Sequence, residues 1–463
     1  MRVLGHHLRS QILAMAALEA VALFGALYAA AFLRFHGSVD QFAMAHGPLW
    51  AQGICISLTM MMALLSMGMY SSRQRSSAEG QVLRIIASGA FAFAMLALLY
   101  YVVPDRWIGR GVLALAVFVG IVFSGAIRLI FSRLVDQNLF KRRVLVYGAG
   151  SQAQLIALLR RRSDQRGFYI VGFVKGSEEP QVPSDKLLKH KGSLLNLCRE
   201  HEVDEIVVAM DDRRRDFPVQ DLLDCRLADI DVIDLPSFLE RETGKVRLDA
   251  VNPSWLIFGH GFSRSGPRQL TARTLDIIAS VALLAFTWPI MLITILAIKI
   301  EDGISAPVFY RQKRVGLDGK PFDVLKFRSM RVDAEKDGKA QWAAQKDRRV
   351  TRVGLVSRSI RVDELPQIFN VLNGDMRFVG PRPERPEFVD DLSRKIPFYR
   401  ERHAVKPGIT GWAQLCYPYG ASERDAAEKL QYDLYYVKNH NLLFDITILV
   451  QTAEVILWRK GSR

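Results

Sequence analysis

Four long apolar segments fill most of the first 135 residues of the chain. They cover residues 12–33, 49–69, 82–103 and 112–130. Each is about as long as a helix must be to cross the hydrocarbon core of a bilayer. The pattern therefore predicts four transmembrane α-helices over residues 1–135. Glu19 lies inside the first segment. We expect a neutralised acid that faces the helix bundle, with a functional site as the alternative.

A different pattern, of short apolar runs alternating with helical periods, begins near residue 141. Strands are expected at residues 144–147, 169–174, 205–209 and 231–233. Because alternating strands and helices favour a parallel sheet, residues 141–250 should form a Rossmann-like α/β domain. The first strand leads into Gly148, Gly150 and Ala153, which have the G-x-G-x-x-A spacing of a dinucleotide-binding turn.

That spacing alone is a weak indication of a bound dinucleotide. Close packing of a helix on a strand also requires small residues at these positions. Lys175 follows the second strand, where an acid would normally hold the ribose. A regulatory or assembly role therefore fits the domain better than bound NAD.

A fifth apolar segment, over about residues 275–298, is interrupted by Trp288 and Pro289. Proline removes a helix hydrogen bond and clashes with the preceding turn. Both flanks are rich in Lys and Arg, which places both on the cytoplasmic side. These features favour a re-entrant helix, with Thr287 as a candidate partner for the freed backbone groups. A kinked fifth spanning helix is the alternative.

Composition and charge refine this picture. Half of the 463 residues are hydrophobic, so a membrane protein is expected. The formal net charge of +15 would suggest nucleic acid in a soluble protein, but here the basic residues cluster beside apolar segments. This is typical of contact with anionic lipid and phosphorylated ligands. We expect membrane lipid as a partner and no nucleic acid.

Basic residues also predict the orientation. They lie before the first apolar segment and after the second and fourth: Arg2, Arg9, Arg73, Arg75, Arg128, Arg133, Lys141, Arg142 and Arg143. These ends should be cytoplasmic. The four cysteines have no metal-binding spacing, which favours reduced thiols on the cytosolic side.

The segment VFYRQKRVGLDGKPFDVLKFRSM predicts a basic β-hairpin around a turn at Gly319. Its cations alternate with apolar residues: Arg311, Lys313, Arg314, Lys326 and Arg328. Lys can act as a point charge for phosphate and Arg as a bidentate fork. The hairpin is therefore a candidate diphosphate site rather than only a solvated face.

The stretch from residue 356 to 388 combines the adjacent acids Asp363 and Glu364 with Pro366, an Asn373–Gly374 turn and a Pro381–Arg382–Pro383 corner. Acids beside arginines can hold a divalent metal and a phosphorylated substrate. Acids just ahead of a proline also fit the N-terminus of a helix. Both interpretations are open on the pattern alone.

The order of the motifs KFRSM, VDELPQIFNVLNGDM, VGPRP and VKPGITGW over residues 268–463 resembles the bacterial sugar transferase family. The four spans and the Rossmann-like domain also resemble its large members. The resemblance implies an α+β membrane-associated catalytic domain over residues 265–463, with a Pro-broken re-entrant helix. It also implies transfer of hexose 1-phosphate from a UDP-sugar to polyprenyl (undecaprenyl) phosphate, with release of UMP.

In that family Asp363 corresponds to the nucleophile that forms an aspartyl-phosphosugar intermediate. Asp363 is also the expected ligand of Mg²⁺, and Glu364 is its expected catalytic partner. Arg358 should contact phosphate and Arg382 should help to seat the nucleotide. Lys326 and Arg328 are further substrate-binding candidates. They are named from the basic pattern of the hairpin and not from the resemblance.

The resemblance also implies the bacterial inner membrane, a cytoplasmic catalytic domain, surface polysaccharide synthesis and a plausible homodimer. Two alternatives remain: a membrane-bound NAD-dependent nucleotide-sugar dehydratase or epimerase, and a non-catalytic assembly scaffold. The hexose is left open. Near the C-terminus, residues 438–459 predict one helix with a polar stripe that includes Asp445 and Thr452. This helix should lie in the membrane interface or in the core.

Overall fold

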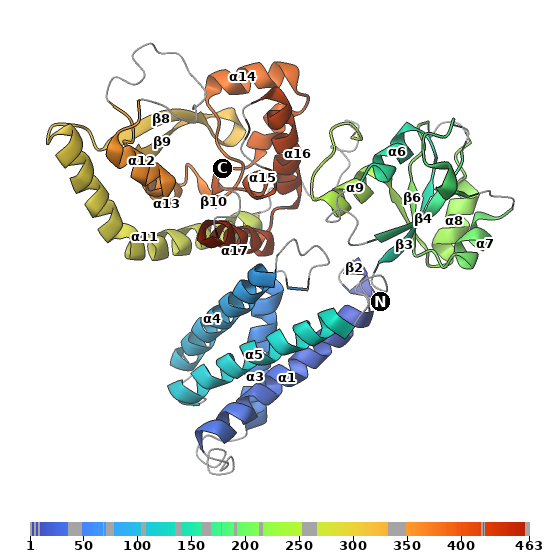
Figure 1. Cartoon of the computed structure of the whole chain (residues 1–463), viewed down its shortest axis with the longest axis horizontal. Coiled ribbons are helices and arrows are strands. Elements are labelled where there is room, and N and C mark those ends of the chain that lie inside the picture. The colour runs from blue at the N-terminus through green and yellow to red at the C-terminus, as the bar shows by residue number, and fades with distance from the viewer. Residues whose placement is uncertain are drawn as a thin grey trace. The chain divides into compact units, whose positions relative to one another are not determined.

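The computed structural model divides into two units, Met1–Thr243 and Gly244–Arg463. It describes residues 2–3, 6–7, 10–35, 49–67, 69–70, 78–102, 108–134, 141–159, 168–176, 178–188, 192–212, 216–251, 266–331, 349–417, 420 and 422–458. Figure 1 shows the elements of each unit.

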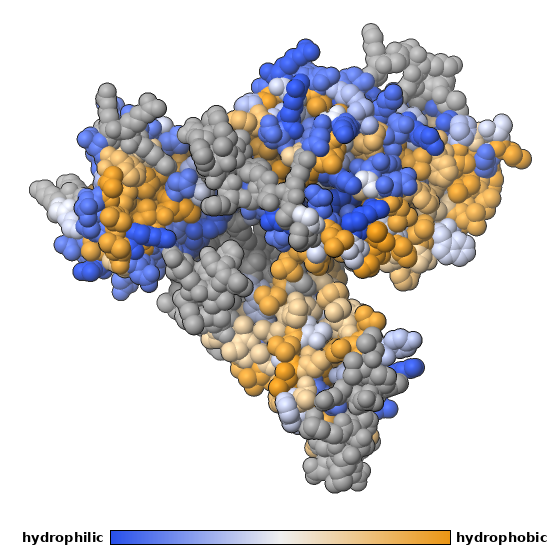
Figure 2. Space-filling view, turned by 180° about the vertical axis from the view of Figure 1, so that it is seen from behind, coloured by the Kyte–Doolittle hydropathy of each residue, from blue (hydrophilic) through white to orange (hydrophobic). Residues whose placement is uncertain are grey.

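Unit 1 begins with a minimal hairpin of β1 (Arg2–Val3) and β2 (His6–His7), followed by four apolar helices. The helices are α1 (Ser10–Arg34), α3 (Leu49–Ser66), α4 (Ala78–Val102) and α5 (Arg110–Leu134). The predicted four apolar helices are therefore confirmed. Three are long enough to cross a bilayer, whereas α3 is a shorter apolar helix over Leu49–Leu65. Figure 2 shows the apolar surface of this bundle.

Glu19 faces the interior of the bundle, as the sequence predicts, and is fully buried. It is an ion-pair partner of Arg128, whose Nε lies 2.7 Å from Oε1. Ser124 Oγ donates to the same carboxylate at 2.7 Å, and the hydroxyl of Tyr70 also donates to it. Since an unpaired charge in hydrocarbon is costly, this cluster fixes α1 against α5.

The rest of unit 1 is a five-stranded parallel sheet with the order β5-β4-β3-β6-β7. The strands are β3 (Arg142–Tyr147), β4 (Phe168–Val174), β5 (Leu187–Leu188), β6 (Glu205–Val208) and β7 (Asp231–Asp234). The helices are α6 (Ser151–Ala157), α7 (Leu194–Glu200), α8 (Val219–Leu227) and α9 (Leu235–Thr243), with a 3₁₀ turn at Ser184–Lys186. The strand order reverses beside the central β3, as in doubly wound folds. The predicted parallel α/β domain is confirmed.

Unit 2 mixes short strands with helices, as predicted for an α+β domain. Its helices are α11 (Gly266–Asp302), α12 (Arg352–Ser359), α13 (Gln367–Asn373), α14 (Pro386–Lys395), α15 (Trp412–Cys416), α16 (Glu423–Asn439) and α17 (Leu442–Trp458). Its strands are β8 (Phe309–Val315), β9 (Pro321–Phe327), β10 (Arg377–Val379) and β11 (Gly408–Thr410). The 3₁₀ turns are η4 (Leu317–Gly319), η5 (Val362–Glu364) and η6 (Tyr399–Ala404).

Helix α11 contains the Pro-broken apolar segment. Figure 1 shows that it bends about midway along its length. Pro289 lies inside it, and the hydroxyls of Thr287 and Thr294 donate to the carbonyls of Leu283 and Ile290. Such bonds to the carbonyl four residues earlier bend helices, so they add to the effect of the proline. Thr287 thus bonds a carbonyl of the preceding turn. The carbonyl that Pro289 leaves without its helix N–H is that of Ala285, four residues earlier. Thr287 bonds the carbonyl of Leu283 instead, so it is not the partner of the freed group.

Both halves of α11 are attached to unit 2. Asp276 accepts the N–H of Phe378 at 3.0 Å and lies 3.3 Å from Nε of Arg377. Arg377 also pairs with Asp445 of α17 at 2.6 Å. At the other end of α11, Glu301 accepts the N–H groups of Arg352 and Val353 at the start of α12. The bent helix is therefore fixed to one unit at both ends.

The surface of α11 between these attachments is apolar. Large hydrophobic side chains are exposed along it, including Phe286 at 82%, Trp288 at 58%, Ile293 at 65% and Ile300 at 85%. Figure 2 shows apolar side chains gathered on this unit as well as on the bundle. An exposed apolar surface of this kind is typical of a membrane contact.

The helix predicted over residues 438–459 is present over Leu442–Trp458, but its predicted start is wrong. Helix α16 ends at Asn439 and α17 begins at Leu442, because Asn441 accepts the N–H of Phe444 and starts a new helix. Asp445 is buried, and Thr452 Oγ1 lies 2.8 Å from Thr410 Oγ1. These two polar residues therefore face the core of unit 2 rather than water.

Candidate active site

The candidate site begins at the hairpin of β8 and β9, which pair antiparallel. An isolated two-stranded hairpin is marginally stable in water. Here the buried side chain of Asn370, on α13, accepts the N–H of Leu325 at 2.9 Å and donates to the carbonyl of Asp323 at 2.8 Å. These are the contacts that a third strand would make. They fix Lys326, the next residue of β9, relative to α13.

The turn that carries the two acids lies between α12 and α13. Gly354 lets α12 approach the end of β9, because a Cβ at this position would lie 2.0 Å from the carbonyl oxygen of Ser329. The chain then reverses through Arg361, which has a left-handed φ of 56°. This conformation costs a non-glycine residue on the order of 1 kcal/mol. It delivers Asp363 and Glu364 in the single turn η5.

One oxygen of Glu364 is held by two cations from different segments, and Nη1 of Arg361 lies 3.8 Å from the other oxygen. Lys326 Nζ and Arg382 Nη2 each lie 2.9 Å from Oε1 of Glu364. Burial opposes the charged form of Glu364, but Arg382 and Lys326 outweigh it and hold the pKa of this carboxyl below its ordinary value. Glu364 is therefore ionised at neutral pH.

Asp363 differs from Glu364 both in its contacts and in the direction of its pKa shift. It is 9% exposed and accepts no hydrogen bond from the residues that the structure describes. Burial, followed by repulsion from Glu364, raises the pKa of Asp363 above its ordinary value, although Lys326, Arg358 and Arg382 partly offset these effects. A carboxylate that is buried, adjacent to cations and without a donor suits a nucleophile or a metal ligand.

The structure brings together most of the predicted site residues. Lys326, Arg382, Glu364 and Asp363 form one cluster, and Arg358 is exposed on α12, close enough for its charge to lower the pKa of Asp363. Burial, the main influence, lowers the pKa of Lys326.

Arg328 follows β9, and no contact joins it to the acids among the described residues. Its Nε and Nη1 are buried and have no acceptor within that part of the chain. Two cations of β8 do not join the cluster either. Arg311 and Lys313 are exposed, so for them the solvated face is the correct interpretation.

Asp363 and Glu364 lie directly ahead of α13, as the helix N-terminus interpretation expects, but neither side chain caps the helix. Helix α13 begins at Gln367 after Pro366, and no side chain caps its first turn. Its end agrees with the predicted Asn373–Gly374 turn, since Gly374 is left-handed with a φ of 88°.

The donor set at Asp363 fits Mg²⁺ in a limited sense. No group of three or more His, Cys, Asp or Glu side chains converges within the described ranges. Mg²⁺ commonly binds one or two carboxylates and completes its shell with water and substrate phosphates. Asp363 could supply such a carboxylate, whereas Glu364 is already engaged by Lys326 and Arg382.

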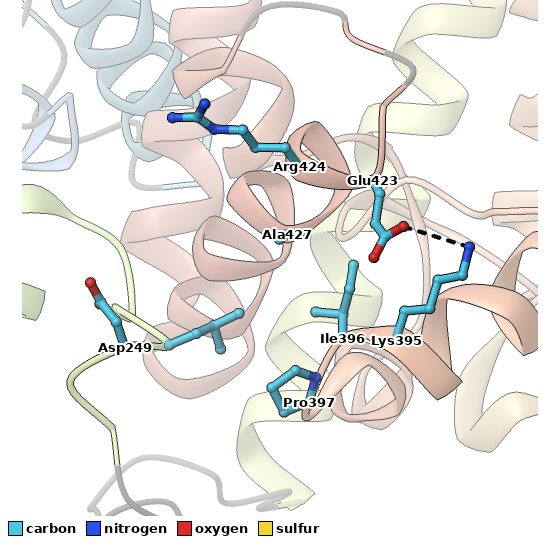
Figure 3. A pocket seen from close by; sticks show the side chains of 8 residues that line it. Asp249, Lys395, Ile396, Pro397, Glu423, Arg424 and Ala427 are labelled. Atoms are coloured by element: carbon cyan, nitrogen blue, oxygen red, sulfur yellow. Dashed lines mark ion pairs between the residues drawn. The ribbon is translucent and has the colours of Figure 1, made fainter.

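An open hollow of about 600 Å³ lies elsewhere on unit 2 (Figure 3). Its walls come from the end of α14, the start of α16 and residues 248–249, and include Ile396, Arg424 and the pair Lys395–Glu423 at 3.5 Å. None of the predicted site residues lines it. It therefore has no part in the chemistry of Asp363.

The glycine turn of unit 1 is filled by the chain itself. Asp211 accepts the N–H groups of Ser151 and Gln152 at 2.9 and 2.8 Å, and Glu178 accepts that of Ala149 at 3.0 Å. These are the donors that would face a pyrophosphate in a dinucleotide-binding domain. A Cβ at Gly150 would lie 2.3 Å from Oδ2 of Asp211. The three small residues, Gly148, Gly150 and Ala153, thus accommodate internal carboxylates and close packing.

Two residues that shape the site have no recognisable role in the sequence. Asn370 lies within the motif VDELPQIFNVLNGDM, and Arg402 lies just before VKPGITGW. A buried amide and a buried guanidinium have no periodic signature, and their partners are distant in sequence. Only their position within or beside recognised motifs could have singled them out.

Comparison with known protein families gives two matches. Residues 267–459 match the bacterial sugar transferase family, and residues 66–223 match a CoA-binding domain.

Several characterised proteins are similar to this chain. A UDP-N-acetylgalactosamine-undecaprenyl-phosphate N-acetylgalactosaminephosphotransferase of Aeromonas hydrophila is 43% identical over 240 residues, which are 52% of this chain and 55% of that protein. A UDP-glucose:undecaprenyl-phosphate glucose-1-phosphate transferase of Xanthomonas campestris pv. campestris is 32% identical over 82% of this chain and 81% of its own length. A transferase of Escherichia coli (strain K12) with the same activity name is 33% identical over 72% of this chain and 71% of its own.

The residues of unit 1 do not fit the cofactor that the second family match suggests. Coenzyme A and NAD both carry a pyrophosphate, and the turn that would receive it already binds Asp211 and Glu178. An additional anion would meet two carboxylates in place of free N–H groups.

We therefore expect that the full-length protein binds neither coenzyme A nor NAD⁺. Equilibrium dialysis of the detergent-purified chain against each labelled cofactor, at concentrations up to about 1 mM, should give no saturable binding. A characterised CoA-binding protein serves as the positive control. Saturable binding at micromolar concentration would show that the two carboxylates leave the turn.

Proposed function

The chain belongs to the bacterial sugar transferase family, and from that membership we propose that it transfers a hexose 1-phosphate from a UDP-sugar to polyprenyl (undecaprenyl) phosphate. The observation that carries the proposal is the unequal pair Asp363 and Glu364. Glu364 is tied to Lys326 and Arg382, whereas Asp363 has no donor among the described residues.

The first chemical step is an attack by a carboxylate oxygen of Asp363 on the β-phosphorus of the UDP-sugar. The bond from that phosphorus to the bridging oxygen breaks, and UMP leaves with the electron pair. An acyl phosphate remains, in which the carboxyl group of Asp363 is joined to the sugar phosphate as a mixed anhydride. Lys326, Arg358 and Arg382 surround the acid with positive charge, which supports stabilisation of the phosphoryl oxygens.

In the second step an oxygen of the polyprenyl phosphate attacks the same phosphorus. The bond to Asp363 breaks, the carboxylate is regenerated and a polyprenyl diphosphate sugar is formed. Asp363 would hold Mg²⁺, whose charge would offset the repulsion between anionic groups. Glu364, fixed beside the reacting acid, keeps the two cations oriented during both steps.

The membrane side of the proposal rests on α11. We propose that it enters and leaves the bilayer on the cytoplasmic face of the bacterial inner membrane. Its bend at Pro289, its exposed apolar surface and the attachment of both its ends to unit 2 support this topology. The exposed Leu355 and Val356 on α12 would extend the membrane contact. A homodimer stays a prediction.

The alternatives are less well supported. An NAD-dependent dehydratase or epimerase would need the glycine turn that Asp211 and Glu178 occupy. A scaffold would not need a buried acid beside three cations. The relatives act on different sugars by name, N-acetylgalactosamine and glucose, so the hexose is left open.

The transferase proposal predicts UMP release from a UDP-sugar. Purified protein with Mg²⁺ and undecaprenyl phosphate should release UMP from at least one UDP-hexose or UDP-N-acetylhexosamine. Asp363→Asn should abolish release because its amide is a poor nucleophile, while Asp390→Asn, at an exposed acid of α14, should retain it. Without acceptor, mass spectrometry should locate a sugar phosphate on Asp363. No release with any sugar from folded protein would refute the transferase, and an adduct on another residue would refute the nucleophile.

The raised pKa of Asp363 predicts a shift in the pH profile. Asp363 must be ionised to attack, so activity is lost as the pH falls through its pKa. Glu364→Gln removes the neighbouring negative charge and leaves Lys326 and Arg382 free to act on Asp363, which lowers this pKa. The acid limb of kcat/KM should therefore move to lower pH, whatever the height of the plateau. Glu387→Gln, an exposed control, should leave the limb in place. If the acid limb of Glu364→Gln stays in place or moves to higher pH, the assignment of the limb to Asp363 is contradicted.

The re-entrant topology predicts cytoplasmic access after α11. In a cysteine-free background, Ser305→Cys, at an exposed turn, should react with an impermeant maleimide only after the inner membrane is opened. Ser38→Cys, in the loop expected on the other side, serves as the control that reacts in intact spheroplasts. Labelling of Ser305→Cys in intact spheroplasts would mean that α11 spans the bilayer.

A further inference from the structure

The Pro381–Arg382–Pro383 corner is held by its carbonyl groups. Prolines have no N–H, so a corner of this kind can be fixed mainly through its oxygens. Four consecutive carbonyls, those of residues 381–384, each accept a hydrogen bond from a different residue. The donors are the N–H of Gly408 at 3.0 Å, Nη2 of Arg402 at 3.0 Å, Nη1 of Arg314 at 3.1 Å and the N–H of Val315 at 2.9 Å.

Arg402 is the most deeply placed of these donors. Its Nη2, which donates to the carbonyl of Arg382, also lies 2.7 Å from Oδ2 of Asp433 on α16. Its Nη1 donates to the hydroxyl of Tyr399 at 2.7 Å, and its guanidinium carbon lies 5.2 Å from the centre of that ring. Arg402 is 5% exposed and Asp433 is 2% exposed. A buried arginine is tolerated only with such partners, so its position is strongly determined.

Arg314 holds the next carbonyl from the hairpin side. Its Nε and Nη2 donate to Oε1 of Gln312, and its Nη1 lies 3.6 Å from Oε2 of Glu384. The cation that sequence reasoning grouped with the phosphate candidates therefore supports the corner instead. The two arginines hold adjacent carbonyls, and the side chain of Arg382 projects from between them to Glu364 at 2.9 Å.

We propose that Arg402, anchored by Asp433, is a positioning residue that sets where the Arg382 guanidinium lies relative to Glu364 and Asp363. Arg402 has no hydrogen bond or ion pair with either acid among the described contacts. Its influence on the reaction thus passes through the main chain of Arg382. The kinetic test of this role measures UMP release and therefore rests on the transferase activity proposed above.

The role requires a guanidinium rather than only a positive charge. The planar fork lets Arg402 reach the Arg382 carbonyl, Asp433 and Tyr399 together. Lysine would keep the pair with Asp433 but could not hold all three groups in one plane. Arg402→Lys should therefore remain folded while the corner loses part of its support.

The test is a double-mutant cycle on UMP release by the full-length protein. Arg402→Lys should lower kcat/KM by about 10- to 100-fold, because small displacements of a positioned group cost rates of this size. Arg382→Gln should cost at least as much. In the double variant the second change should add less than about threefold, since both act through one guanidinium. Arg400→Met, at an exposed arginine of η6, should leave the rate unchanged.

A second measurement separates this inference from the transferase proposal. Hydrogen exchange followed by mass spectrometry should show faster exchange in the peptide covering residues 378–388 of Arg402→Lys, with unchanged exchange in α13. This holds whether or not UMP is released. Multiplicative losses in the double variant, or wild-type exchange of the corner in Arg402→Lys, would overturn the positioning role. If the wild-type protein releases no UMP while Arg402→Lys still shows faster exchange of residues 378–388, only the transferase proposal is refuted.

Discussion

The catalytic unit depends on one carboxylate that is shared by two cations. Glu364 comes from the turn after α12, Lys326 from β9 and Arg382 from the proline corner, so a single ion cluster joins three separate segments. Without that carboxylate two positive groups would face each other in a partly buried space. A buried ion cluster contributes little net stability, but loss of one member is costly, and this makes the arrangement specific. Among the residues that the structure describes, the adjacent Asp363 is left without a hydrogen-bond donor.

Acidic side chains also fix the apolar helix α11. Asp276 lies in the first half of the bent helix α11 and accepts the N–H of Phe378, and Glu301, near the end of the helix, accepts two N–H groups of α12. The apolar surface between them is therefore presented by a helix whose ends cannot separate from the catalytic unit. In unit 1, the Glu19–Arg128 pair joins two membrane helices in a comparable way.

The features that the sequence predicts well are those with a period or a motif. Apolar segments of helical length, alternating strands and the Asn373–Gly374 turn all have local causes, and each appears in the structure. Features that depend on distant partners were missed or misassigned. The sequence groups Arg314 with the phosphate candidates, but Arg314 donates to the carbonyl of Pro383. The polar stripe leaves open whether Asp445 faces the interface or the core, and its ion pair with Arg377 places it in the core. Lys326 and Arg382 could be named from their motifs, but nothing local indicates that both meet Glu364.

The side chain of Asn370 also affects how this domain behaves toward other chains. An unpaired strand edge is a template on which another strand can add. By bonding Leu325 and Asp323, Asn370 occupies that edge of β9 with a side chain instead of a strand. The β9 edge of the short basic hairpin is thereby protected from the addition of another strand, even though many copies of such a protein share the two-dimensional space of a membrane.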